Sequence, residues 1–155
     1  MTAAAIPEKL RDTLELLDLL DDRMARIDML IGIADRFTDV PERVATRPFS
    51  DEHKVPACES EAYAWAEPLE DGTLKFHFAV ENPQGISARA MAVLLDEGLS
   101  GAPLERVSNV EGDIIYRVFG DELSMGKSMG LMGMVSMVQN YARKAMAAAG
   151  PAMTR

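Results

Sequence analysis

The chain has 155 residues, of which 48% are hydrophobic, enough for one folded domain with a core of its own. Its formal net charge of -9 at pH 7 argues against nucleic acid and anionic membrane surfaces as partners, because both repel a polyanion. The single cysteine cannot form an internal disulfide, and the start of the chain does not have the pattern of a secretion signal. We therefore expect one cytoplasmic domain over residues 1–155, with an ordered core at about 7–147 and no membrane association.

Two amphipathic helices are predicted at the start of the chain. The first begins after Pro7, which fits the first turn of a helix, and its leucines recur at helical spacing. These leucines are Leu10, Leu14, Leu17 and Leu20. Asp21 and Asp22 can cap the second helix, which is expected to end near Phe37. Its predicted buried stripe is Met24, Ile27, Ile31 and Ala34.

A long loop and a β-hairpin follow. From Thr38 to Ala57 the helical pattern gives way to prolines and charges, which predicts a loop of the length that is usually functional or disordered. A turn at Asp71-Gly72 then joins two strand-like segments. The second segment is expected to place its apolar side chains on one face, and His77 on the other as a surface or packing residue. The apolar set is Leu74, Phe76, Phe78 and Val80.

The remainder of the chain is predicted to be mainly helical. Ser87 can cap a helix that stops at Gly98, whereas residues 114–119 fit either a strand or a short helix. A long, largely buried helix is expected at about 128–149. Its buried stripe is Leu131, Val135, Val138, Ala142 and Ala145. Five methionines near its start fit core packing better than a binding groove.

The most informative segment is Val55 to Glu61, which contains the only cysteine, Cys58. A proline and polar neighbours place this thiol at or near the surface, although a lone cysteine is more often a small core residue. Nearby Glu59 would raise the pKa of the thiol, so activation would need help from elsewhere. The candidates in sequence are His53, Lys54 and Lys127, each of which can equally be a solvated surface residue.

Other kinds of site fit the sequence less well. Gly126-Lys127-Ser128 lacks the glycine that a phosphate-binding loop needs five residues earlier, where Asp121 stands instead. One cysteine and two histidines do not supply a closed zinc site or an iron–sulfur cluster site, so we expect no metal and no cofactor. A thiol hydrolase that pairs Cys58 with His53 stays open, as does an interaction module built on the methionine-rich helix.

Two motifs in the right order resemble the SufE family. They are Val55-Pro56-Ala57-Cys58-Glu59-Ser60, followed by an aromatic strand at Tyr63, and Leu123-Ser124-Met125-Gly126-Lys127-Ser128-Met129-Gly130-Leu131. The resemblance covers roughly residues 7–147 and implies an α+β fold, a small antiparallel sheet packed against helices in two layers, shared with IscU-type scaffolds. It also implies that residues 114–119 are helical.

In function, the resemblance implies a sulfur acceptor. Such a protein takes persulfide sulfur onto Cys58 from a pyridoxal-phosphate cysteine desulfurase of the SufS type, which it is expected to stimulate, and passes the sulfur to a scaffold complex of the SufBCD type. Ala57, Glu59 and Ser60 would shape the loop that meets the partner, with Lys127 nearby. Ala57 stands where the family commonly has glycine, and Lys127 where it commonly has arginine, which changes the loop geometry and removes a bidentate contact.

Overall fold

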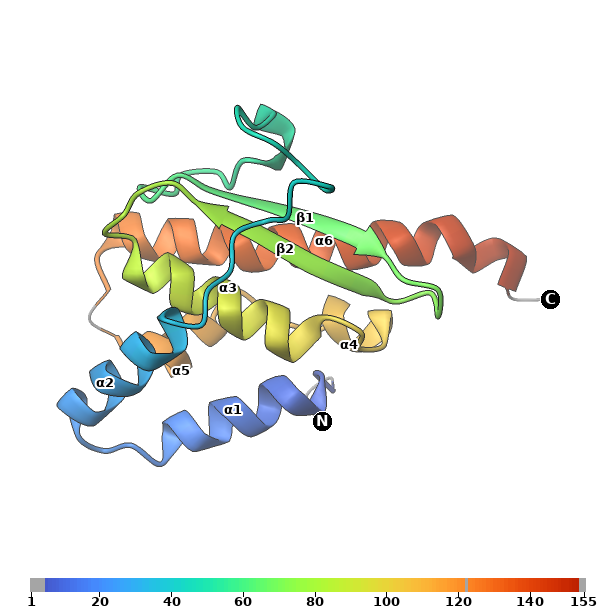
Figure 1. Ribbon diagram of the computed structural model, residues 1–155. Helices are drawn as coiled ribbons and strands as arrows, with labels where there is room; N and C mark the ends of the chain where they lie inside the picture. Colours follow the sequence, from blue (N-terminus) through green and yellow to red (C-terminus); the bar gives the residue numbers. More distant parts are fainter. Residues whose placement is uncertain (1–4, 122, 154–155) are drawn as a thin grey trace.

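The computed structural model describes residues 5–121 and 123–153, which form helices around one β-hairpin (Figure 1). The helices are α1 (Glu8–Asp18), α2 (Arg23–Ala34), α3 (Ile86–Leu99), α4 (Leu104–Ser108), α5 (Ile114–Phe119) and α6 (Met125–Met153), with a 3-10 turn, η1, at Asp51–His53. The strands β1 (Ala62–Pro68) and β2 (Leu74–Val80) pair in antiparallel register, with Ala62 opposite Val80. The α+β class predicted from the sequence is confirmed.

Helix α3 lies at the centre of the packing. It contacts β2 and α6 on one side, and α1 and α2 on the other. In Figure 1 the hairpin covers α3 and α6, while α1, α2 and α5 lie beyond α3, away from the sheet. Gly98 of α3 permits one close helix crossing, because a methyl group added there would lie 3.0 Å from Leu10 Cβ.

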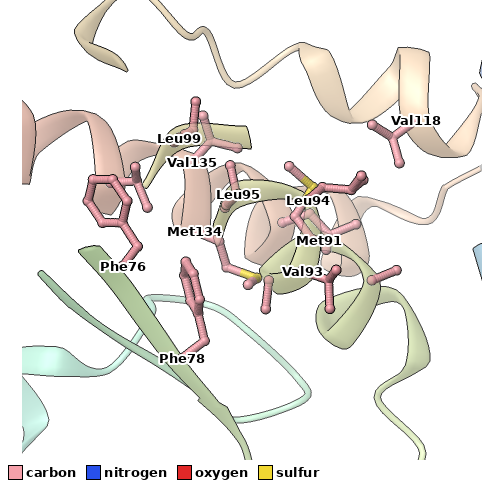
Figure 2. Close-up of a cluster of buried hydrophobic side chains, with 14 of the residues drawn as sticks. Phe76, Phe78, Met91, Val93, Leu94, Leu95, Leu99, Val118, Met134 and Val135 are labelled. Atoms are coloured by element: carbon pink, nitrogen blue, oxygen red, sulfur yellow. The ribbon is translucent and has the colours of Figure 1, made fainter. Parts of the chain in front are cut away.

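The main core lies between the inner face of the hairpin and the helices. Phe76 and Phe78 of β2 point towards Met91 and Leu95 of α3, and Met134 of α6 fills the space beside them (Figure 2). The side chains expected to share one face of the second strand are all buried here, as are Leu10, Leu14 and Leu17 of α1. The fourth predicted leucine, Leu20, is half-buried and lies beyond the end of α1. The alternating pattern of β2 and the helical period of α1 therefore predicted the correct faces.

The outer face of the hairpin is covered by the proline-rich loop, which passes over the sheet in Figure 1. Val40 of this loop is buried with Trp65 and Ala79, and the ring of Phe49 packs edge-on against Trp65 at a centroid distance of 4.9 Å. Arg47 ties the loop to the residue that follows β2 through hydrogen bonds to Glu81. This long loop is thus a packed cover with a small apolar cluster of its own.

The buried stripe predicted for the second helix, Met24, Ile27, Ile31 and Ala34, is wrong apart from Ala34. Leu30, Ile33 and Ala34 are buried, whereas Ile27 and Ile31 are 36% and 42% exposed. Helix α2 carries apolar residues around most of its circumference, so the period alone could not tell which side would pack on α3.

Two predicted helix starts also need correction. Ser87 does not cap α3, because the helix begins at Ile86 after Gly85 and no side chain caps it. The last helix begins at Met125 instead of Ser128, since Ser124 Oγ accepts a hydrogen bond from the Lys127 backbone N–H at 3.2 Å and so caps the earlier turn.

Residues 114–119 form α5, as the resemblance implied. In the described part of the chain, none of the helices is both long and apolar enough to cross a membrane.

Candidate functional site

Cys58 lies in a short loop, residues 56–61, which we call the cysteine loop. The Val55 N–H donates to the Ala62 carbonyl at 2.8 Å and closes the base of the loop, at the start of β1. Within it, the Glu61 N–H donates to the Cys58 carbonyl at 3.1 Å, which forms a tight turn around the thiol. The loop is therefore held at its base by the sheet, with Cys58 near its tip.

One face of α6 carries glycines where the cysteine loop passes. We call Gly126, Gly130 and Gly133 the glycine face. A methyl group added at Gly130 would lie 2.9 Å from Cys58 Cα and 3.2 Å from its Cβ, and one at Gly133 would lie 3.0 Å from Val55 Cγ1. Each glycine in a helix costs ~1 kcal/mol relative to alanine, so the close approach of loop and helix offsets a substantial loss of helix propensity.

Gly126, the third glycine, is approached only by a side chain, whereas loop backbone approaches the other two glycines. A methyl group at Gly126 would collide with the Glu59 carboxylate, so this carboxylate lies on the first turn of α6. The positive end of the helix dipole favours a negative charge at this place. Val55, Cys58 and Glu59 thus follow the helix in order towards its N-terminus.

Cys58 is half-buried and packs against the main core, and it opens onto a cleft of about 350 Å³ between the starts of α3 and α6. The cleft is lined by both backbone and side chains, among them Cys58, Ser60, Gly85, Ile86, Lys127 and Gly130. Lys127 is exposed at its edge. The structure therefore brings Lys127, distant in the sequence, to the same cleft as the thiol.

Two residues of the cysteine loop have left-handed backbone conformations that are unusual for side chains other than glycine. Ala57 has φ 58° and Glu61 has φ 53°. Each such residue costs ~1–2 kcal/mol because Cβ approaches the carbonyl oxygen. Ala57, which stands where the resemblance leads us to expect glycine, therefore has a conformation that glycine would adopt without strain.

The predicted site residues separate into exposed and packed positions. Ala57 and Glu59 are exposed, whereas Ser60 is half-buried and its Oγ lies against Gly85. The Ser60 carbonyl accepts a hydrogen bond from the Asn82 N–H at 3.1 Å, which joins this end of the loop to the chain after β2. The glycine face was missed from the sequence, although the i, i+4, i+7 spacing of glycines in a helix is a signal of close packing.

His53 does not face the thiol. Its Nδ1 lies 3.0 Å from the Ala64 carbonyl and 3.2 Å from the Tyr141 hydroxyl, and its ring stacks on Trp65. Burial raises the pKa of Tyr141, and the nearby charge of Glu52 adds to the shift. His53 is thus a packing residue between β1 and α6.

His77 is buried on the outer face of the sheet, where its Nε2 lies 2.8 Å from the Glu67 carboxylate. Arg43 also contacts Glu67, and its hydrogen bonds, followed by that of His77, lower the Glu67 pKa to about 2. Within residues 5–121 and 123–153, no hydrogen bond or ion pair joins either histidine to Cys58, and no group of three potential metal-ligating side chains gathers.

The methionines of α6 have mixed positions. Met134 is fully buried in the core, as expected for core packing. Met125 and Met129, however, are 79% and 53% exposed on the first turns of α6. Core packing was therefore the correct interpretation for Met134 but not for these two residues.

Comparison with known proteins gives a family and a fold. The family model described as SufE, Fe-S metabolism associated domain, matches residues 11–142, which include the cysteine loop and the glycine face. Among solved structures, the chain is similar to the solution structure of a hypothetical protein from Thermus thermophilus, with 25% identity and a TM-score of 0.69. The similarity covers 92% of this chain and 98% of that one. No curated protein matches the sequence.

Proposed function

Because the chain belongs to the SufE family and so has a role in iron–sulfur metabolism, we propose that it is a sulfur acceptor with Cys58 as the accepting residue. Its donor would be the persulfide of a pyridoxal-phosphate cysteine desulfurase of the SufS type. Its receiver would be an iron–sulfur scaffold complex of the SufBCD type. The observation that carries this proposal is the place of the only thiol, half-buried on a pinned loop at the mouth of a cleft.

The transfer is a thiol exchange that needs no external oxidant or reductant. The Cys58 thiolate attacks the outer sulfur of the donor persulfide, a new S–S bond forms on Cys58, and the S–S bond of the donor breaks. The donor cysteine leaves as a thiolate and takes up the proton that Cys58 gave up. The sulfane sulfur is then carried on Cys58 as a persulfide.

The surroundings of Cys58 suit a carrier better than a self-sufficient enzyme. Glu59 and Glu61 put negative charge near the thiol, and both are exposed in their loop. Lys127 lines the same cleft, and we expect its positive charge to favour the thiolate. A donor enzyme that covers the cleft would strengthen the attraction between the two charges by excluding water.

The hydrolase alternative, with His53 as the base, has little geometric support. The Nδ1 atom of His53 is engaged by Ala64 and Tyr141, and its Nε2 lies 3.7 Å from Glu52. The interaction-module alternative keeps one favourable observation, the exposed Met125 and Met129 on the first turns of α6. These residues also fit the rim of a desulfurase contact, so they support the acceptor proposal equally well.

Further parts of the proposal concern location and turnover. We expect the protein to act in the cytoplasm, where a lone half-buried thiol stays reduced. We also expect it to stimulate its desulfurase, because an acceptor that removes the enzyme persulfide frees the enzyme for another cycle.

Desulfurase turnover tests the proposal. Alanine formation from cysteine would be measured without added reductant, in the presence of wild-type protein or of Cys58→Ser. The wild type should raise turnover and Cys58→Ser should not, whereas equal stimulation by both would contradict a role for the thiol.

A further inference from the structure

The contact between Glu59 and α6 differs from the other contacts of the cysteine loop. Val55 and Cys58 meet the glycine face through atoms close to the backbone, whereas Glu59 meets Gly126 through the carboxylate at the end of its side chain. Glu59 is also exposed. This contact can therefore be broken without unpacking any part of the core.

The Glu59 contact lies next to the strained part of the loop. Ala57 and Glu61, which bracket the segment from Cys58 to Ser60, both have a left-handed backbone that is unfavourable in L-residues. The packing on α6 must therefore outweigh this strain, since the strain would be relieved if the segment left the helix. A charge held at a helix N-terminus contributes to that balance.

We propose that Glu59 is a positioning residue, a latch whose carboxylate on the first turn of α6 holds Cys58 against Gly130 and limits the access of reagents to its sulfur. The functional role of this latch rests on the proposed acceptor function, because a desulfurase that displaces the carboxylate would expose the thiol to the donor persulfide. The glycine at 126 is the counterpart of the latch, since any side chain there would occupy the place of the carboxylate.

Gly126→Ala and Glu59→Gln test the latch from its two sides. The first adds a methyl group where the carboxylate lies, keeps every charge and improves helix propensity, so destabilisation of α6 cannot explain its effect. The second removes the charge and keeps the size of the side chain. The matched controls are Gly32→Ala, a helical glycine with nothing within 4 Å of the added methyl group, and Glu61→Gln, which removes a charge from the same loop.

The measurement is the rate of Cys58 alkylation by iodoacetamide, a small neutral reagent, as a function of pH and without a desulfurase. The pH profile separates two effects: its midpoint gives the thiol pKa, and its plateau at high pH gives the accessibility of the sulfur. Glu59→Gln and Glu61→Gln both remove a negative charge from the same loop, so an effect of charge alone would appear equally in both variants.

If the latch exists, the plateau rate of alkylation should change only in the two variants that break the contact. Gly126→Ala and Glu59→Gln should each raise the plateau rate about two- to fivefold, the usual effect of one charge at a helix end on an equilibrium. The double variant should rise no further, because both changes break the same contact. The two controls should keep the wild-type plateau.

Equal plateaus for wild type, Gly126→Ala and Glu59→Gln would overturn the latch, as would a rise in Glu59→Gln alone or an equal rise in the controls. These results are independent of the acceptor role. A wild-type protein that accepts no sulfur would refute the acceptor role, while the alkylation rates would still decide on the latch.

Discussion

Gly130→Ala would test the packing of the cysteine loop against α6 most severely. The added methyl group would lie 2.9 Å from Cys58 Cα, where ordinary van der Waals contact begins at 3.4 Å, and 3.3 Å from the Ala57 carbonyl oxygen. The loop backbone would therefore have to move by roughly half an ångström or more to restore a normal contact.

The expected effect on stability follows from two opposing contributions. Alanine favours the helix by ~1 kcal/mol over glycine, while overpacking of this kind typically costs ~1–3 kcal/mol. Gly130→Ala should therefore leave the free energy of unfolding unchanged or lower it by up to ~2 kcal/mol. Gly32→Ala, which meets nothing, should raise it by ~1 kcal/mol.

Thermal unfolding would compare the two variants directly. In a chain of this size, 1 kcal/mol shifts Tm by ~2–4 °C, so the Tm of Gly32→Ala should exceed that of Gly130→Ala by several degrees. Urea unfolding would give the same order. If Gly130→Ala raised Tm as much as Gly32→Ala does, the loop would not pack closely on α6.

Three other substitutions test separate parts of the account. Ala57→Gly should raise the free energy of unfolding by ~0.5–1 kcal/mol in urea, because φ 58° strains alanine, and a loss of stability would argue against that conformation. The lowered pKa of Glu67, from 4.5 to about 2, means that its ion pair with Arg43 stabilises the fold fully above pH 4.5 and less as the pH falls towards 2. The stability advantage of wild type over Glu67→Gln should therefore shrink across that range, and a constant difference would contradict the pairing. His53→Phe keeps a ring stacked on Trp65, so sulfur acceptance by the variant should persist. A variant that no longer accepts sulfur would instead support a catalytic base at position 53.

Sequence patterns predicted elements correctly where one face alone is apolar. Leu10, Leu14 and Leu17 of α1 and the alternating apolar residues of β2 each marked one face of their element, and the structure buries that face. Helix α2 has apolar residues on several sides, so its contact with α3 decided which of them are buried. Helix starts were harder to predict, because Ser87 and Ser124 are both possible caps and only their surroundings distinguish them.

The candidate site was predictable in part for a related reason. Proline and polar neighbours placed Cys58 in a loop, and the half-buried thiol agrees with a position near the surface. The glycine face could not be recognised from its own segment, because its role depends on a loop from another part of the chain. A histidine close to Cys58 in the sequence suggested a catalytic pair, but η1 and its contact with β1 turn His53 towards Ala64.

Intact mass spectrometry tests the central claim most directly. The protein would be mixed with an active cysteine desulfurase from a matching source and free cysteine, with Cys58→Ser as the control. We predict a gain of one or more sulfur atoms on the wild type, absent from Cys58→Ser and reversed by a reductant. A wild-type mass that stays unchanged, or an equal gain on Cys58→Ser, would contradict the acceptor role.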